Sequence, residues 1–269
     1  MRINTNMAAM SALKNLSKPR TQLEDALAQL SSGKRIPTAG YDAAGLAIAT
    51  RMESETRSYD QALRNTADGI AMTRTAEGAQ HQVSENLDRI RELSVQAANG
   101  TLSESDRQAI QQEVDGLTAE IDRIAESTEY NGRKLLDGSL DTVIQAGDGA
   151  EDQVRITARA LDSASLEMDS LDLASPEGAG EAMAAADTAI DRVSTARAEL
   201  GSTQNRLEST IRNLDASREN SAAARSRIMD VDLARAAAEV TKGEILAQSS
   251  ISMIVRTSQL PAQALALLG

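Results

Sequence analysis

The sequence lacks cysteine, tryptophan and phenylalanine, and it contains only three tyrosines among its 269 residues. The absence of cysteine excludes disulfides, thiol nucleophiles and cysteine-ligated zinc. Because aromatic side chains are nearly absent, any core must be aliphatic and alanine-rich, which favours helix-on-helix packing over a sandwich or a barrel. Proline is confined to four positions, so long helices can run between them: Pro19, Pro37, Pro176 and Pro261.

Negative charge is concentrated in the middle of the chain. Residues 1–40 hold six basic and two acidic side chains, residues 225–269 hold five and four, and the whole chain carries −12, so residues 41–224 carry −17. An acidic middle without a basic, aromatic-rich stripe disfavours nucleic acid and anionic membranes as partners. No stretch approaches the ~20 apolar residues of a membrane span, and no Sec signal is present. We expect a cytosolic protein or one exported without a cleaved signal.

Both ends of the chain carry apolar stripes that need a partner helix. Burying about five leucines contributes roughly 10 kcal/mol, whereas ordering some 30 residues costs about 30–45 kcal/mol of backbone entropy. An isolated pair of terminal helices would therefore be marginal, and we expect these segments to fold as they assemble with neighbouring copies. The predicted contact residues are Leu13, Leu16, Leu23, Leu27, Leu30, Leu246, Ile251, Ile254, Leu260, Leu265 and Leu268.

Helix signals predict a mainly α fold, a long antiparallel helical bundle or coiled coil with its terminal helices paired. The first helix is expected over residues 4–33, where Gly33 is a natural stop. Asp42 is placed to cap a second helix that begins at Ala43 and ends near Ala98.

Two further helices are predicted. Ser103 and Asp106 resemble a capping box before a third helix, whose apolar residues follow an unbroken 4-3 spacing. A long helix resumes at Met183 and could continue past Ile228 into the terminal segment. The apolar residues of the third helix are Ile110, Val114, Leu117, Ile121 and Ile124.

The only convincing strand signals lie at residues 142–146 and 153–157, around the turn Gly147-Asp148-Gly149. Residues 162–181 are polar and contain proline and glycine, so we expect a loop there. The predicted division of the chain is a terminal helix at 1–33, a connector at 34–42, a helical domain with a β-hairpin near 142–158 at 43–224, and a second terminal helix at 225–269.

Several motifs, in order along nearly the whole chain, resemble bacterial flagellins. The N-terminal ones are Ile3-Asn4-Thr5-Asn6, LSSGKRI at 30–36, DAAGLAIATRM at 42–52 and LDRIRELSVQAANGT at 87–101. They are followed by EVDGLTAEIDRIAESTEYNGRKLLDG at 113–138, by the strand at 143–147 and by the whole of 224–269.

The resemblance implies a structural subunit that polymerises into the extracellular flagellar filament and is exported unfolded by the flagellar type III apparatus. The implied partners are further copies of the chain, an export chaperone, the filament cap protein and the hook–filament junction proteins, with no cofactor. Only about 50 residues separate Gly138 from Ile190, so the large variable outer domain of many flagellins is expected to be absent. Residues 37–41 depart from the usual family pattern.

The resemblance also implies a patch that an animal Toll-like receptor binds, formed by Arg89, Leu93 and Glu113. Spacing alone makes Arg89 a solvated helix residue with i,i+3 ion pairs. His81 is the only histidine, so no histidine pair can bind a metal. With no catalytic motif in the sequence, we expect a protein that is not an enzyme.

Two other functions remain open from the residues. A hook–filament junction protein would have the same architecture but would adapt the filament instead of polymerising. A cytosolic coiled-coil scaffold would instead have stable helical termini in the dilute monomer, with protected amides across residues 1–30 and 240–269.

Overall fold

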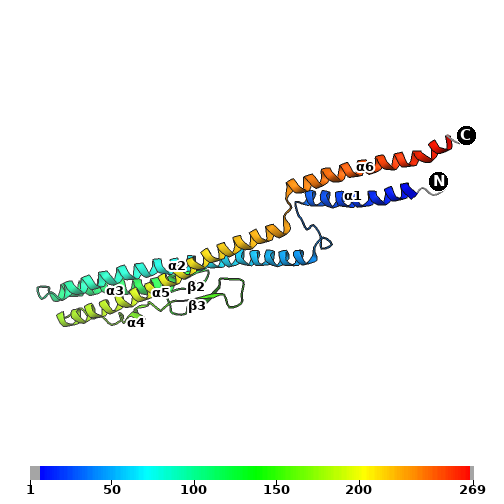
Figure 1. Cartoon of the computed structure of the whole chain (residues 1–269). Helices are drawn as coiled ribbons and strands as arrows, with labels where there is room; N and C mark the ends of the chain where they lie inside the picture. Colours follow the sequence, from blue (N-terminus) through cyan, green and yellow to red (C-terminus); the bar gives the residue numbers. More distant parts are fainter. Residues whose placement is uncertain (1–6, 267–269) are drawn as a thin grey trace. The chain divides into compact units, whose positions relative to one another are not determined.

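The computed structural model describes residues 7–266, apart from the side chains of Ala8 and residues 260–266. The predicted mainly α fold is confirmed, with two small antiparallel strand pairs. Figure 1 shows the order of the elements. They are α1 (Met7–Ser32), α2 (Ala43–Ala97), α3 (Glu104–Ser127), β1 (Glu129–Tyr130), β2 (Arg133–Lys134), β3 (Asp141–Gln145), β4 (Gln153–Thr157), α4 (Ser163–Leu166), α5 (Pro176–Met229) and α6 (Leu233–Ala266).

The chain forms two compact units. The first, called the terminal unit below, contains the described residues up to Thr56 and those from Glu219 onward; the second, the middle unit, is Arg57–Arg218. The long helices α2 and α5 each contribute to both units, so the borders between the compact units fall inside these helices.

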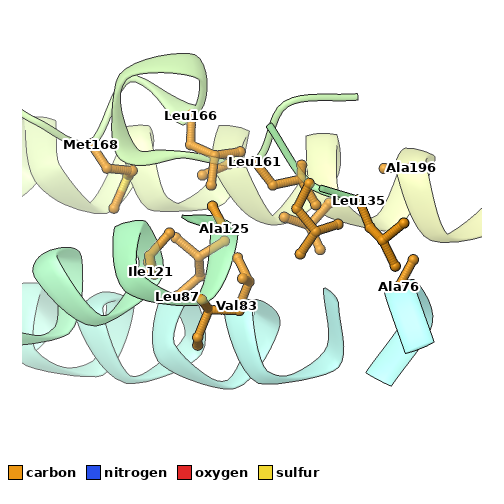
Figure 2. Close-up of a cluster of buried hydrophobic side chains, with 14 of the residues drawn as sticks. Ala76, Val83, Leu87, Ile121, Ala125, Leu135, Leu161, Leu166, Met168 and Ala196 are labelled. Atoms are coloured by element: carbon orange, nitrogen blue, oxygen red, sulfur yellow. The ribbon is translucent and has the colours of Figure 1, made fainter. Parts of the chain in front are cut away.

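The middle unit is built around one aliphatic core to which α2, α3 and α5 all contribute. Figure 2 shows Val83 and Leu87 of α2 facing Ile121 and Ala125 of α3. The periodic positions of α3 are buried as their spacing predicts, with Leu117 partly buried at the margin. Alanine allows close helix approach in a core without phenylalanine or tryptophan, and many alanines of α5 are buried: Ala179, Ala182, Ala186, Ala189 and Ala196.

The prediction of a loop over residues 162–181 is wrong in part. The segment contains the short helix α4, and α5 begins at Pro176, where proline suits the first helical position. Four apolar side chains in or next to this segment are fully buried, and they are spaced too irregularly to give a periodic signal: Leu161, Leu166, Met168 and Leu173. Figure 2 shows three of them inserted between the helices of the middle unit.

Polar side chains of α3 hold this segment in place. The Asp122 carboxylate accepts hydrogen bonds from the backbone N–H and the hydroxyl of Ser163, at 2.7 and 2.8 Å. The Gln111 amide donates to the Leu171 carbonyl at 3.0 Å and accepts from the Leu173 N–H at 2.8 Å. These bonds satisfy backbone groups that burial would otherwise leave unpaired.

The predicted β-hairpin is present, with strands at Asp141–Gln145 and Gln153–Thr157 that pair in antiparallel register. A second, smaller hairpin of β1 and β2 was not predicted as strand. Its turn residues Asn131 and Gly132 have φ of 50° and 74°. Positive φ at both central residues is the type I′ geometry that joins antiparallel strands most tightly.

Helix ends follow the predicted caps. Gly33 has φ 67° directly after α1, and the Asp42 carboxylate accepts from the Gly45 N–H at 2.8 Å at the start of α2. The capping box of Ser103 and Asp106 is complete. The expected continuation of the long helix past Ile228 into the terminal segment is wrong, because α5 ends at Met229 and α6 starts anew at Leu233.

Candidate assembly surface

Helices α1 and α6 lie side by side in antiparallel orientation within the terminal unit, as Figure 1 shows. The pairing of the terminal helices was predicted. Small residues line the contact: Ala26 is 3% exposed, Ala236 is 2% exposed, and Gly243 is buried. A Cβ placed on Gly243 would lie 3.1 Å from the Cβ of Leu23, so a side chain at residue 243 would require Leu23 to shift by a few tenths of an ångström.

The predicted contact residues are only partly covered by this pairing. Leu16, Leu23, Leu30 and Ile254 are half-buried, whereas Leu13 is 55% exposed. Three more predicted contacts are exposed: Leu27, Leu246 and Ile251. The side chains of Leu260 and Leu265 and the whole of Leu268 lie outside the described residues. One partner helix therefore covers only one side of each stripe.

Exposed apolar side chains gather in the terminal unit. Of the fourteen large apolar residues exposed among those described, all except Val95 and Val143 belong to this unit. An apolar surface of this extent marks an interaction site. On the paired helices the exposed residues are Met7, Met10, Leu13, Leu27, Leu233, Ile245, Leu246, Ile251, Met253 and Val255.

The two connectors that carry α1 and α6 are hydrogen-bonded to each other, an arrangement that we call the clasp (Gly33–Arg35 with Met229–Val231). The Arg35 N–H donates to the Met229 carbonyl at 2.6 Å, and the Val231 N–H donates to the Gly33 carbonyl at 3.1 Å. The Arg35 side chain also donates to the Ile228 carbonyl at 2.9 Å. No sequence signal predicted this contact, because its partners lie almost 200 residues apart.

A small core supports the clasp. Ile36 and Met229, 2% and 7% exposed, pack with Ala49 of α2, and Leu46 and Ile228 lie partly buried against them. The start of the connector 34–42, whose path the sequence left open, is thereby packed against residues of α2 and α5.

The Tyr41 hydroxyl ties the end of this connector back to α1 by donating to the Asp25 carboxylate at 2.7 Å. This hydrogen bond raises the pKa of Tyr41, with smaller contributions from desolvation and from the Asp25 charge. Beside it lies a groove of about 310 Å³ between α1 and α6, lined by Gln22, Gln29, Lys242, Leu246 and their neighbours. The groove is open and mixed in polarity, and it contains no arrangement of groups typical of catalysis.

The predicted receptor patch is only partly on the surface. Arg89 donates to Glu113 at 2.8 Å and to Glu92 at 3.1 Å, and these exposed ion pairs raise the pKa of Arg89, with Glu113 the larger cause. Leu93, in contrast, is 2% exposed and belongs to the core of the middle unit. The expectation that Leu93 forms part of a surface patch is therefore wrong for the isolated chain.

The single histidine does not belong to a metal-ligand cluster in the described part of the chain. His81 is exposed, and its Nε2 lies 3.7 Å from a Glu85 carboxylate oxygen one turn along α2. Over residues 7–266, no cluster of three potential metal-ligating side chains occurs. Within the same range, each helix is too short or too polar for a bilayer span.

Comparison with known proteins agrees with this arrangement of helices. Residues 3–141 match the bacterial flagellin N-terminal helical region, and residues 183–268 match the bacterial flagellin C-terminal helical region. The chain belongs to the bacterial flagellin family. Between the two matches lie most of the β-hairpin, the segment that contains α4 and the first residues of α5, which together connect the two matched regions of this flagellin.

Individual relatives cover the whole chain. The flagellin of Halalkalibacterium halodurans is 42% identical over 100% of both chains. The flagellar filament 33 kDa core protein of Treponema phagedenis is 39% identical, also over 100% of both chains. The crystal structure of Bacillus cereus flagellin is 36% identical and superposes with a TM-score of 0.51 over 56% of this chain and 88% of that one.

Proposed function

We propose that this flagellin polymerises into the flagellar filament through the exposed faces of α1 and α6. The observation that carries the proposal is the concentration of uncovered apolar side chains on the paired terminal helices. The family is one of structural proteins, and the relatives named above include a filament core protein. The filament is expected outside the cell, where it transmits motor torque for swimming.

The physical basis is burial of the same helices by neighbouring copies. Leu13 and Leu27 on α1 and Ile251 on α6 each keep about half of their surface uncovered in the single chain. Burying a large apolar side chain completely contributes about 1.5–3 kcal/mol. If each contact joins unlike surfaces of two copies without closing a ring, the product is an open helical polymer.

Substitution of one exposed seam residue tests this proposal. We expect Ile251→Asp to abolish filaments, because each interface would bury an unpaired carboxylate. The matched control Ile251→Val keeps the side chain apolar and should still polymerise. The measurement is electron microscopy of purified protein after salt-induced assembly, with circular dichroism to show that the monomer remains folded. Normal filaments from Ile251→Asp would refute the proposed surface.

Filament formation by the purified chain would exclude both alternatives, and hydrogen exchange of the monomer distinguishes them from each other. A hook–filament junction protein would bind filament ends without polymerising by itself. A cytosolic scaffold would not form filaments and would show protected amides across residues 1–30 and 240–269 in the monomer.

Before assembly the same surface needs protection, so we propose an export chaperone that covers the exposed face of α6. Six of the large apolar residues exposed in the described structure lie between Leu233 and Val255. Export in the unfolded state through the flagellar type III apparatus, and contacts with the filament cap and junction proteins, belong to the same proposal. Its test is whether α6 is needed for export: secretion of a chain that lacks residues 233–269 at the level of the full chain would contradict chaperone capture there.

We also propose that the exposed ion-paired surface of Arg89 and Glu113 binds an animal Toll-like receptor when the protein is monomeric. The support is the exposure of both side chains, 48% and 47%, on neighbouring helices. Arg89→Ala should weaken receptor activation by monomer. An unchanged response over a full dose range would remove this proposal without affecting filament assembly.

A further inference from the structure

We propose that the clasp sets the register in which α1 pairs with α6, and that Arg35 and Val231 are positioning residues for filament assembly. This inference rests on the proposed function, because it concerns how the assembly surface is prepared. The family matches and the exposed apolar residues define the helices that assemble, but they do not explain what aligns the two helices.

Alignment is a physical problem because the two helices are far apart in the chain. Bringing such ends together costs loop-closure entropy that grows with the length of the chain between them. The clasp holds the adjacent ends of the two helices close together, because α1 ends at Ser32, directly before Gly33, and α6 begins at Leu233, two residues after Val231. Once the clasp has closed, the adjacent helix ends pair at a high effective concentration.

The clasp has one defined register. Lys34 faces Asp230 in an antiparallel bridge, and the two backbone bonds flank this pair. Ile36 and Met229, which lie beside the bridge, are both buried in the supporting core. A shift by one residue would turn alternate side chains to the opposite face, and it would expose Ile36 or Met229. The supporting core therefore opposes a slip of the bridge.

A second contact shows that register matters farther along the pair. Leu23 packs against Gly243, the position at which α6 carries no side chain. Leu23 precedes Lys34 by about as many residues as Gly243 follows Asp230, so the two positions meet when the helices pair in antiparallel orientation from the bridge. A slip of one helical turn would place Glu239 or Ala247 against Leu23, where a Cβ does not fit without displacement. A single register therefore satisfies the clasp and the helix pair together.

A fixed register gives assembly one surface. The exposed residues of α1 and α6 form a composite face only when the two helices keep a constant alignment. A mixture of registers would present several faces, and only a fraction of the chains would be competent to add to a filament. The apparent affinity for the filament end would fall by that fraction.

Loss of one clasp bond tests the proposal. Val231→Pro removes the N–H that donates to the Gly33 carbonyl. The matched control is Val231→Ala, which shortens the same side chain but keeps the N–H of the clasp bond. We expect Val231→Pro to raise the critical concentration for polymerisation about tenfold, the value for one lost backbone hydrogen bond, and Val231→Ala to leave it within about twofold. Equal effects of the two substitutions would overturn the proposal.

A covalent clasp provides the opposite test. The paired residues of such a bridge have Cα atoms about 4.5 Å apart, which lies within the range that a disulfide spans. Because the chain has no cysteine of its own, Lys34→Cys with Asp230→Cys can form only one intramolecular disulfide. The oxidised form should polymerise at a lower critical concentration than the reduced form of the same variant. A threshold that is unchanged or higher on oxidation would contradict the proposal.

The outcomes also separate this proposal from the function on which it rests. If the wild-type chain forms no filaments, the proposed function fails. Hydrogen exchange of the monomer then still tests the clasp: residues 7–32 should be better protected in the oxidised cysteine variant than in the reduced one. Equal protection in the two forms would refute a register-setting clasp.

Discussion

Two residues one helical turn apart on α2 have opposite surroundings. Arg89 is exposed and ion-paired, whereas Leu93 is 2% exposed. Residues of α3 and α5 belong to the same buried cluster as Leu93, so the buried arc of α2 is wider than the seam of a two-stranded coiled coil. Resemblance to a family therefore identified Leu93 as important without showing that its side chain faces the core.

At the residue scale, Leu93→Ala should destabilise the middle unit far more than Arg89→Ala. Truncation of a buried leucine costs about 2–5 kcal/mol because it leaves a cavity, whereas an exposed ion pair contributes at most about 1 kcal/mol. Urea unfolding followed by circular dichroism measures both values. Comparable losses for the two variants would mean that Leu93 is not a core residue.

At the scale of a whole helix, the start of α3 is fixed by hydrogen bonds between neighbouring residues that the sequence predicts. The Ser103 hydroxyl and backbone N–H both donate to the Asp106 carboxylate, at 2.7 and 3.0 Å, while the Asp106 N–H donates to the Ser103 hydroxyl. These bonds lower the pKa of Asp106 below its ordinary value of 3.8. The start of α3 is thus stabilised by the ionised form of Asp106.

At the element scale, this cap predicts a pH dependence. A lowered folded-state pKa stabilises the fold above the unfolded value of 3.8, and this contribution is lost as pH falls through the folded value. Asp106→Asn should therefore destabilise the protein near pH 6, and its effect should shrink as the pH falls below about 4. Chemical unfolding at both pH values measures the difference. Glu104→Gln, in the same turn but outside the capping box, is the control, and a pH-independent effect of Asp106→Asn would contradict the assignment.

For the whole molecule, the two compact units differ strongly in net charge. The middle unit holds sixteen basic and thirty acidic side chains, whereas the sequence segments of the terminal unit hold twelve and ten. The units thus carry −14 and +2. Copies that approach through nearly neutral helices still bring strongly acidic units toward one another, and this repulsion opposes assembly.

At the scale of the whole molecule, we expect the critical concentration for polymerisation to fall as salt is added. Raising the ionic strength from about 0.01 M to 0.15 M shortens the screening length from about 30 Å to about 8 Å, which weakens repulsion between the acidic units. Light scattering at increasing NaCl measures the threshold. Thermal unfolding of the monomer in the same buffers serves as the control for changes in fold. A threshold that rises with salt would show that attraction between opposite charges dominates the contacts.

The sequence alone predicted the elements that depend on local order. Helix periodicity, the caps at Gly33, Asp42 and Ser103, and the main hairpin all rest on interactions between residues a few positions apart. The apolar stripes of the two ends also showed that these segments need partners. The sequence therefore determined the fold class, and its motifs determined the family.

Tertiary structure decided what depends on residues distant in the chain. It placed Leu93 in the core, filled the core with the irregular segment around α4, ended α5 at Met229, and joined the connectors through the clasp. None of these has a periodic signal, because burial and backbone pairing at such positions are set by partners up to about two hundred residues away. Local spacing specifies a helix and its apolar face, but only packing decides which part of that face is covered within the chain and which part is left for another copy.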